Sequence, residues 1–199
     1  MMAAKLAFIF FSMILTNNYV LVKFLGICPF LGVSKKLDSA IGMSAAVTFV
    51  MVVATAATWP IYTNLLEPQG LGYLQTIVFI LVIAILVQLL ETVMKRFMPP
   101  LYNALGIYLP LITTNCTILG VTILNIDNGY SYAESLVCAL GAGLGFMLAM
   151  VMFSGVRRRL EEARPPKPFE GLPITLVAAS IVSLSFTGFG GLIEKIFGM

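Results

Sequence analysis

The stretch Cys28-Pro29-Phe30-Leu31-Gly32-Val33-Ser34 returns later in the chain as Cys116-Thr117-Ile118-Leu119-Gly120-Val121-Thr122. Both copies fit the pattern Cys-x-x-Leu-Gly-Val-Ser/Thr, and the two cysteines are 88 residues apart in a chain of 199 residues. In membrane proteins built from internal repeats, the functional site usually lies where the copies meet. The repeated residue that can bind a metal is the cysteine. The pattern therefore predicts a fold in two halves with a metal site between them.

The composition around this repeat is that of a membrane protein. Hydrophobic residues make up 59% of the chain and charged residues 11%, and the mean hydropathy is +0.99. A soluble domain has roughly a quarter charged residues, so this chain cannot cover a surface that faces water. Five uncharged runs provide the ~20 residues that a membrane helix needs, and a sixth span, over 6–34, is interrupted by Lys23. The five runs are 39–66, 68–90, 97–126, 135–156 and 171–193. We expect an all-α integral membrane protein with six transmembrane helices in a single membrane domain, 1–199.

The basic residues predict how these helices are oriented. Nine of the twelve Lys and Arg residues lie in the first, third and fifth loops, at 34–38, 95–100 and 157–170. The second and fourth loops, around Glu67 and Asp127, have none. Because cytoplasmic loops carry an excess of Lys and Arg, the three odd loops are expected in the cytoplasm and both termini outside. The net charge of +3 gives no reason to expect a nucleic-acid partner.

Three spans lie in each half, 1–96 and 97–199, so the second half enters the membrane from the opposite side. The two motifs are then related by an axis in the membrane plane, and their cysteines approach each other only near the middle of the bilayer. Helices 1 and 4 are expected to be broken there, because helix breakers and small polar side chains surround each cysteine. These residues are Gly26 and Pro29 around Cys28, and Pro110, Thr113, Thr114, Asn115 and Gly120 around Cys116.

The third cysteine has a simpler interpretation. Cys138 begins the small-residue stretch 138–145, in which Gly141 and Gly145 are typical of close helix contact. Roughly one lone membrane cysteine in five is expected to be a ligand, and the others pack as small apolar residues. We assign Cys138 to packing. The same stretch lacks the preceding strand and the third glycine of a dinucleotide-binding loop.

The repeated cysteines are predicted to be metal ligands. Each holds the same place in its copy while neighbouring residues diverge, Pro29 against Thr117 for example. Thiolates favour soft metals, and iron–sulfur clusters normally take four cysteines. With three cysteines and no histidine, this chain supplies two ligands, Cys28 and Cys116. The other two must come from a second copy or from a related membrane protein.

Several polar residues within or beside the spans keep two interpretations each. Lys23 is either a functional charge within the membrane or a long side chain that reaches the interface. Asn17 and Asn18 are expected at a break in the first helix, lined by water or buried in protein. Arg157–Arg159 are most simply topology anchors, and binding of anionic lipid or a partner domain is the lesser option.

Two segments, 17–36 and 109–116, resemble the signatures of a known family. It comprises RnfA, a membrane component of the Rnf electron-transport complex, and its counterpart NqrE in the sodium-pumping NADH:quinone oxidoreductase. The resemblance covers essentially the whole chain. The amino-acid sequence of 24–32 is more similar to the Rnf member than to the quinone-reductase one.

The resemblance implies a redox role. In this family the protein pairs with a homologous, inverted membrane protein, RnfE, and the pair encloses a [2Fe–2S] cluster in mid-membrane with two cysteines from each. These ligands correspond to Cys28 and Cys116 here. The supporting motif residues are Gly26, Pro29, Gly32, Thr114, Asn115 and Gly120. The complex transfers electrons between ferredoxin and NAD⁺, coupled to Na⁺ or H⁺ transport across a bacterial or archaeal cytoplasmic membrane. Flavins and the NAD site belong to the other components (RnfB, RnfC, RnfD and RnfG), so this chain binds neither flavin nor nucleotide and is not active alone.

Three other functions remain open at this point. The first is the equivalent component of a quinone-reducing complex. The second is a secondary transporter in which the repeat forms a substrate site, and the third is a structural anchor that docks redox proteins. The transporter predicts a colourless protein that moves substrate by itself, and the anchor predicts that both cysteines tolerate serine. The repeat favours a functional site, and the thiols favour redox chemistry.

Overall fold

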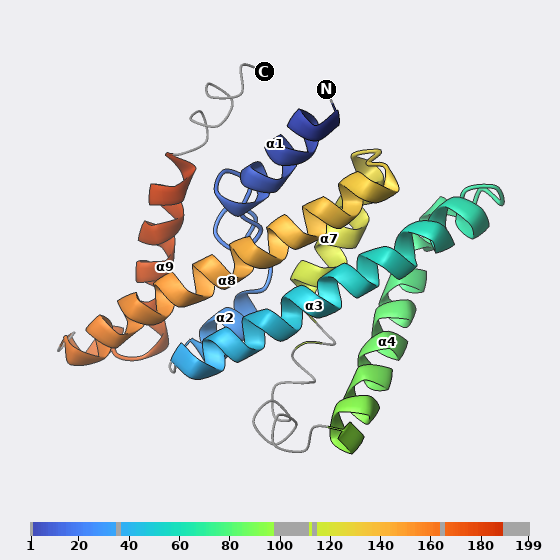
Figure 1. The fold of residues 1–199 in the computed structure, drawn as a ribbon. Helices are drawn as coiled ribbons and strands as arrows, with labels where there is room; N and C mark the ends of the chain where they lie inside the picture. Colours follow the sequence, from blue (N-terminus) through green and yellow to red (C-terminus); the bar gives the residue numbers. More distant parts are fainter. Residues whose placement is uncertain (1, 35–36, 98–111, 113–114, 164–165, 189–199) are drawn as a thin grey trace.

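The computed structural model describes residues 2–34, 37–97, 112, 115–163 and 166–188, and within these ranges the chain forms helices and no strand (Figure 1). The α-helices are α1 (Met2–Ile14), α2 (Ile27–Val33), α3 (Leu37–Ile61), α4 (Gln75–Phe97), α7 (Cys116–Asp127), α8 (Tyr132–Glu162) and α9 (Leu172–Thr187). Three shorter helices connect them, η1 (Tyr62–Leu66), η2 (Gly72–Leu74) and η3 (Lys167–Phe169).

Three helical stretches are long and apolar enough to cross a membrane. They are Leu37–Leu66 with 30 residues, Gly72–Val93 with 22 and Tyr132–Leu160 with 29. They coincide with the runs 39–66, 68–90 and 135–156, so the all-helical membrane class is confirmed. The other apolar helices among the described residues are shorter, at Lys5–Ile14, Cys116–Asp127 and Leu172–Thr187. The count of six spans and the inverted repeat stay predictions.

The outer faces of α4 and α9 are lined by large apolar side chains. On α4, Ile77 is 63% exposed and Leu89 62%, and on α9 Leu184 is 74% exposed. Exposing apolar area to water costs about 25 cal/mol per Å², and a soluble monomer rarely exposes such continuous faces. These surfaces fit lipid tails or the apolar face of a neighbouring membrane protein.

The central helix α8 packs between α1 and α3 through its glycines (Figure 1). A Cβ added at Gly141 or Gly145 would lie 2.9 Å from a backbone oxygen of α1, and one added at Gly143 would lie 2.5 Å from the Thr48 side chain on α3. Small residues let helix backbones approach closely in membranes, so the expected contact role of Gly141 and Gly145 is confirmed. Cys138 is fully buried on the same helix, as a packing residue would be.

The chain is not helical between α1 and α2, and one buried asparagine bonds to several of the backbone groups near this break. The Asn18 amide Nδ2 donates to the backbone oxygens of Ile14 at 3.1 Å and Gly145 at 2.8 Å. Its Oδ1 accepts from the backbone N–H groups of Val20 at 3.0 Å and Leu21 at 3.3 Å. Within lipid, backbone polar groups must find partners in the protein. The break expected in helix 1 is therefore present, and it is buried in protein at Asn18.

Contacts at both ends of α8 group the loops into two sets. At its N-terminal end, Glu134 pairs with Lys5 at 2.8 Å, and the Trp59 indole N–H donates to the Tyr130 backbone oxygen at 3.0 Å. At its C-terminal end, Arg157 bonds to the hydroxyl of Ser34, at the end of α2. The loops expected outside thus meet at one end of α8, and the first and fifth loops meet at the other.

The glycine contacts of α8 predict a specific loss of stability. Gly145→Ala forces a Cβ against the Met13 backbone oxygen, and overpacking of this kind typically costs ~1–3 kcal/mol. Gly155→Ala, on the same helix with nothing within 4 Å of the added Cβ, is the matched control and should be neutral or slightly stabilising. Thermal unfolding in detergent measures both. Equal melting temperatures for the two variants would contradict the packing described here.

Candidate metal centre

The two repeated motifs meet at their cysteine ends. Cys28 is the second residue of α2, and Cys116 is the first residue of α7. The backbone N–H of Gly26 donates a hydrogen bond to the Cys116 Sγ at 2.9 Å. Two residues of chain span at most about 7 Å, so Cys28 lies close to this bond. The structure therefore brings the two predicted ligands into one site, although 88 residues separate them.

Only glycine fits at position 26. Its φ of +83° lies in the left-handed region, and an added Cβ would lie 2.2 Å from the Thr117 Oγ1 and 3.0 Å from the Phe146 ring. Side chains other than glycine rarely adopt this conformation. Gly26 is thus required both for the turn into α2 and for the close approach of residues 115–117.

A second glycine makes the reciprocal contact. A Cβ added at Gly120 would lie 2.7 Å from the Leu25 Cδ1, so Gly26 and Gly120 each touch the other motif segment. Pro29 is buried in the first turn of α2, where proline is tolerated because the N–H has no helical partner. Gly32 is exposed, and Thr114 lies outside the described residues.

Asn115 begins α7 by capping it. Its Oδ1 accepts from the Thr117 backbone N–H at 2.9 Å, as an N-cap side chain does. Its Nδ2 and the Thr117 Oγ1 are buried, and neither has a hydrogen-bond partner among the described residues. An unpaired buried polar group costs ~1–3 kcal/mol. Two donors on either side of Cys116 therefore remain available to an acceptor that the described part of the chain does not provide.

From this contact α2 and α7 run toward opposite ends of α8. The end of α2 meets Arg157 in the last part of α8. Asn125, near the end of α7, donates to the backbone oxygen of Ser135 in the first turn of α8, at 3.4 Å. The contact itself lies beside Phe146, the middle residue of the apolar stretch Tyr132–Leu160. The cysteine site is thus level with the middle of the apolar stretch of α8.

The two predicted ligands differ from Cys138 in exposure. Cys28 is exposed and Cys116 partly exposed, whereas Cys138 is buried, and all three are free thiols. Within the described ranges, no group of three or more His, Cys, Asp or Glu side chains is arranged to hold a metal ion. Cys28 is therefore accessible to groups outside this chain.

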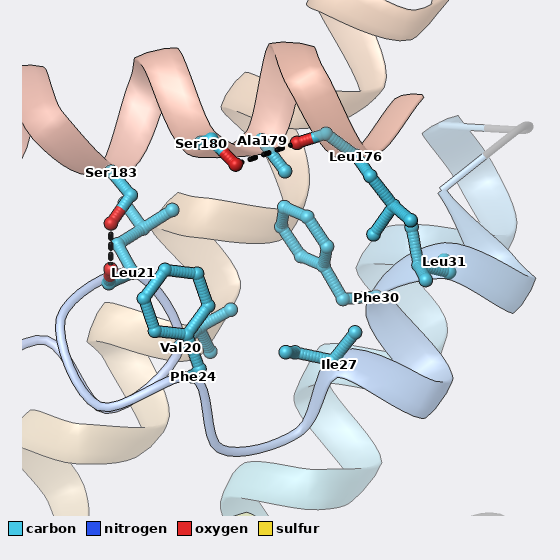
Figure 2. A pocket seen from close by; sticks show the side chains of 10 residues that line it. All are labelled: Val20, Leu21, Phe24, Ile27, Phe30, Leu31, Leu176, Ala179, Ser180 and Ser183. Carbon is cyan, nitrogen blue, oxygen red and sulfur yellow. Dashed lines mark hydrogen bonds between the residues drawn. The ribbon is translucent and has the colours of Figure 1, made fainter. Parts of the chain in front are cut away.

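An apolar groove of about 50 Å³ lies between α9 and the segment 20–31, whose residue Ile27 lines it next to Cys28 in the sequence (Figure 2). Phe24, Ile27 and Phe30 line it from one side, and Leu176 and Ala179 from the other. The two serines in its wall are already bonded, Ser180 to the Leu176 backbone oxygen and Ser183 to that of Leu21. The groove consequently presents hydrocarbon and suits apolar chains better than a polar solute.

Lys23 lies in the break between α1 and α2. Its ammonium lies 5.0 Å from the centre of the Tyr19 ring, a cation–π distance, and the side chain is exposed. Whether Lys23 is a functional charge or a side chain that reaches the interface stays a prediction. Sequence reasoning missed two residues of the site, Thr117 and Leu25. Their only signal was position, within or next to the repeated motif.

These features define an integral membrane protein in which two copies of one motif meet at a pair of cysteines. Residues 6–193 match the family described as Rnf-Nqr subunit, membrane protein. The chain belongs to this family.

Relatives of known assignment extend the likeness over nearly the whole chain. One is the A component of the Na⁺-translocating ferredoxin:NAD⁺ oxidoreductase complex of Acetobacterium woodii, 54% identical over 94% of this chain and 97% of the relative. The A component of the ion-translocating oxidoreductase complex of Syntrophotalea carbinolica is 53% identical, over 95% and 98%. That of Serratia proteamaculans is also 53% identical, over 94% and 96%.

The close contact at Gly26 predicts that a methyl group added at this position, in Gly26→Ala, lowers the stability of the protein. Gly26→Ala combines a strained φ with overlap on the Thr117 Oγ1, and should destabilise the protein by about 2–4 kcal/mol. Gly70→Ala shares a positive φ of 66° but has nothing within 4 Å, so it isolates the backbone strain. Thermal unfolding of both variants and of Gly26→Ala/Thr117→Ala checks this. The double variant should recover part of the loss, and purely additive losses would contradict the overlap.

Proposed function

We propose that this chain is the RnfA component of an ion-translocating ferredoxin:NAD⁺ oxidoreductase, an Rnf complex. The identities to its relatives support this assignment over the quinone-reducing counterpart. The chain acts as one part of this translocase and not alone. The observation that carries the redox role is the contact between Gly26 and Cys116, which joins the two cysteine motifs.

Cys28 and Cys116 are proposed to hold half of a [2Fe–2S] cluster, which supplies one-electron transfer when bound. The surroundings suit a thiolate pair. The Gly26 N–H already donates to the Cys116 sulfur, and hydrogen bonds to sulfur are among the factors that set cluster potentials. The unpaired Asn115 Nδ2 and Thr117 Oγ1 are donors that fit further sulfur acceptors.

The second half of the cluster comes from a partner. The sequence has only three cysteines and no histidine, and Cys138 is buried in packing, so four thiolates require another chain. The homologous, inverted RnfE protein supplies the remaining pair. The exposed Cys28 supports a site that opens onto such a neighbour. RnfB, RnfC, RnfD and RnfG complete the complex and carry its flavins and NAD site.

The two halves of the chain are proposed to be inverted repeats that place the cysteines at mid-membrane. The opposite directions of α2 and α7, and the position of their contact beside Phe146, support this arrangement. In the cytoplasmic membrane, the loops at 34–38, 95–100 and 157–170 face the cytoplasm and both termini face outward. Moving one charge through 100 mV involves about 2.3 kcal/mol. This free energy biases the packing of the opposed helices α2 and α7. The bias couples electron transfer to Na⁺ or H⁺ transport.

Removing either cysteine tests the redox role. In the whole complex, Cys28→Ala and Cys116→Ala should each abolish the cluster's EPR signal, lower the iron content and stop ion uptake into vesicles. Cys138→Ala is the matched control and should retain all three, since that thiol packs in the core. Full ion transport without the cluster would refute the proposal. It would favour a transporter or an anchor in its place.

A labelling experiment tests the topology. In spheroplasts, a membrane-impermeant maleimide should modify Gln69→Cys, in the loop that lacks basic residues, and leave Arg158→Cys unmodified until lysis. The reason is the concentration of Lys and Arg in the loops on the Arg158 side. The unsubstituted chain controls for labelling of the native thiols. Labelling of Arg158→Cys before lysis would reverse the orientation proposed here.

A further inference from the structure

The helix that carries Cys28 is held at its far end by a buried arginine from α8. The Arg157 Nη1 donates to the Leu31 backbone oxygen and, at 2.9 Å, to the Ser34 Oγ. Arg157 is 9% exposed and Ser34 is fully buried. A residue that only sets the membrane orientation needs no such contact, because a charge in the aqueous loop is enough for that role. Arg157 therefore does more than mark the cytoplasmic end of α8.

The two copies of the motif use their last residue in different ways. In the second copy, the Thr122 hydroxyl donates to the Leu119 backbone oxygen at 2.9 Å, and α7 continues to Asp127. In the first copy, the equivalent carbonyl, on Leu31, accepts from Arg157, and α2 ends at Val33. The hydroxyl of Ser34 accepts from the same guanidinium. The repeated Ser/Thr position thus serves an internal bond in one copy and an arginine clamp in the other.

We propose that Arg157 is a positioning residue for Cys28, which it places and tunes through the short helix α2. This inference rests on the proposed function, because it concerns the thiolate of the cluster half-site.

A seven-residue helix needs such support. Isolated helices shorter than about 12 residues are marginal in water, so α2 takes its position from tertiary contacts. Three specific contacts among the described residues help to hold it. Gly26 fixes its N-terminal end, Phe30 stacks on Phe153 of α8 with ring centres 4.2 Å apart, and Arg157 binds its C-terminal end. Among these three, only the arginine contact is both directional and charged.

The guanidinium also lies close enough to act on the thiolate electrostatically. Cys28 and Leu31 are three residues apart on one helix, a rise of about 4.5 Å, and they share a face. The guanidinium is bonded beyond Leu31, more than one turn from Cys28, and because it is buried its charge is screened less than that of an exposed side chain. It stabilises the reduced, more negative state of a cluster bound at Cys28. Removing the charge should therefore lower the reduction potential.

The test uses substitutions at 157 and at the neighbouring exposed arginine. Arg157→Gln, Arg157→Lys and the control Arg158→Gln are introduced into the whole complex, and the cluster is titrated by EPR at poised potentials. Arg157→Gln should lower the potential by an amount equivalent to about a tenfold change in the equilibrium constant, ~59 mV for one electron. Arg157→Lys keeps the charge and should recover most of the shift. Arg158→Gln should match the wild type.

A second pair of variants separates the clamp from general destabilisation. Ser34→Thr places in the first copy the residue that the second copy has at Thr122, and should retain the wild-type spectrum. Ser34→Ala removes one acceptor and should broaden the EPR signal. Hydrogen exchange of the α2 amides provides a readout that needs no cluster. In a Cys116→Ala background, Arg157→Gln should accelerate this exchange at least fivefold, and Arg158→Gln should leave it unchanged.

These outcomes are distinguishable from failure of the proposed function. A potential in Arg157→Gln equal to that of Arg158→Gln overturns the proposal even if exchange rises, because Arg157 then only holds the helix. If the wild-type complex contains no iron centre at these cysteines, the proposed function fails. Exchange then decides only the mechanical part of the inference: faster exchange in Arg157→Gln shows that the arginine holds α2 in place, and unchanged exchange overturns the proposal.

Discussion

The close approach of Gly26 to residues 115–117 is the constraint on which the rest of the site depends. No side chain fits between the two segments, and the Gly26 N–H donates to the Cys116 sulfur. Both α2 and α7 begin here, so their first turns and their cysteines share one small volume. The left-handed conformation of Gly26 turns the chain into α2 without moving it away from α7. A wider separation would leave two unrelated thiols in a helical bundle.

A break in a membrane helix is tolerated only where the protein replaces the missing hydrogen bonds. Asn18 does so between α1 and α2, using both its amide and its oxygen. Asn115 caps the start of α7 with its oxygen, and its amide has no partner among the residues that the structure describes. The difference is physically informative. Asn115, next to the cysteine, has an amide donor with no partner among the described residues. Asn18, at the break, uses both its amide and its oxygen in hydrogen bonds within the fold.

The long helix α8 connects this centre with both ends of the molecule. Its middle touches Gly26 through Phe146, its first turn holds Lys5 through Glu134, and its last part clamps α2 through Arg157. Its glycines let α1 and α3 approach on either side. A straight, continuous helix thus serves as the scaffold for shorter, interrupted ones. The Cys28 thiol is exposed, and an apolar groove lies between the segment 20–31 and α9.

The sequence by itself determined the membrane class, three of the long helices, the pairing of Cys28 with Cys116 as candidates and the packing role of Cys138. Hydropathy, charge placement and repetition are linear properties, so one chain displays them in full. It left undecided the roles of Thr117, Leu25 and Arg157, and whether Asn18 faces water or protein. Those depend on contacts across about 90 to 130 residues of chain. Which atoms meet over such separations is set by helix packing in three dimensions, because local propensity carries no information about a partner that far along the chain.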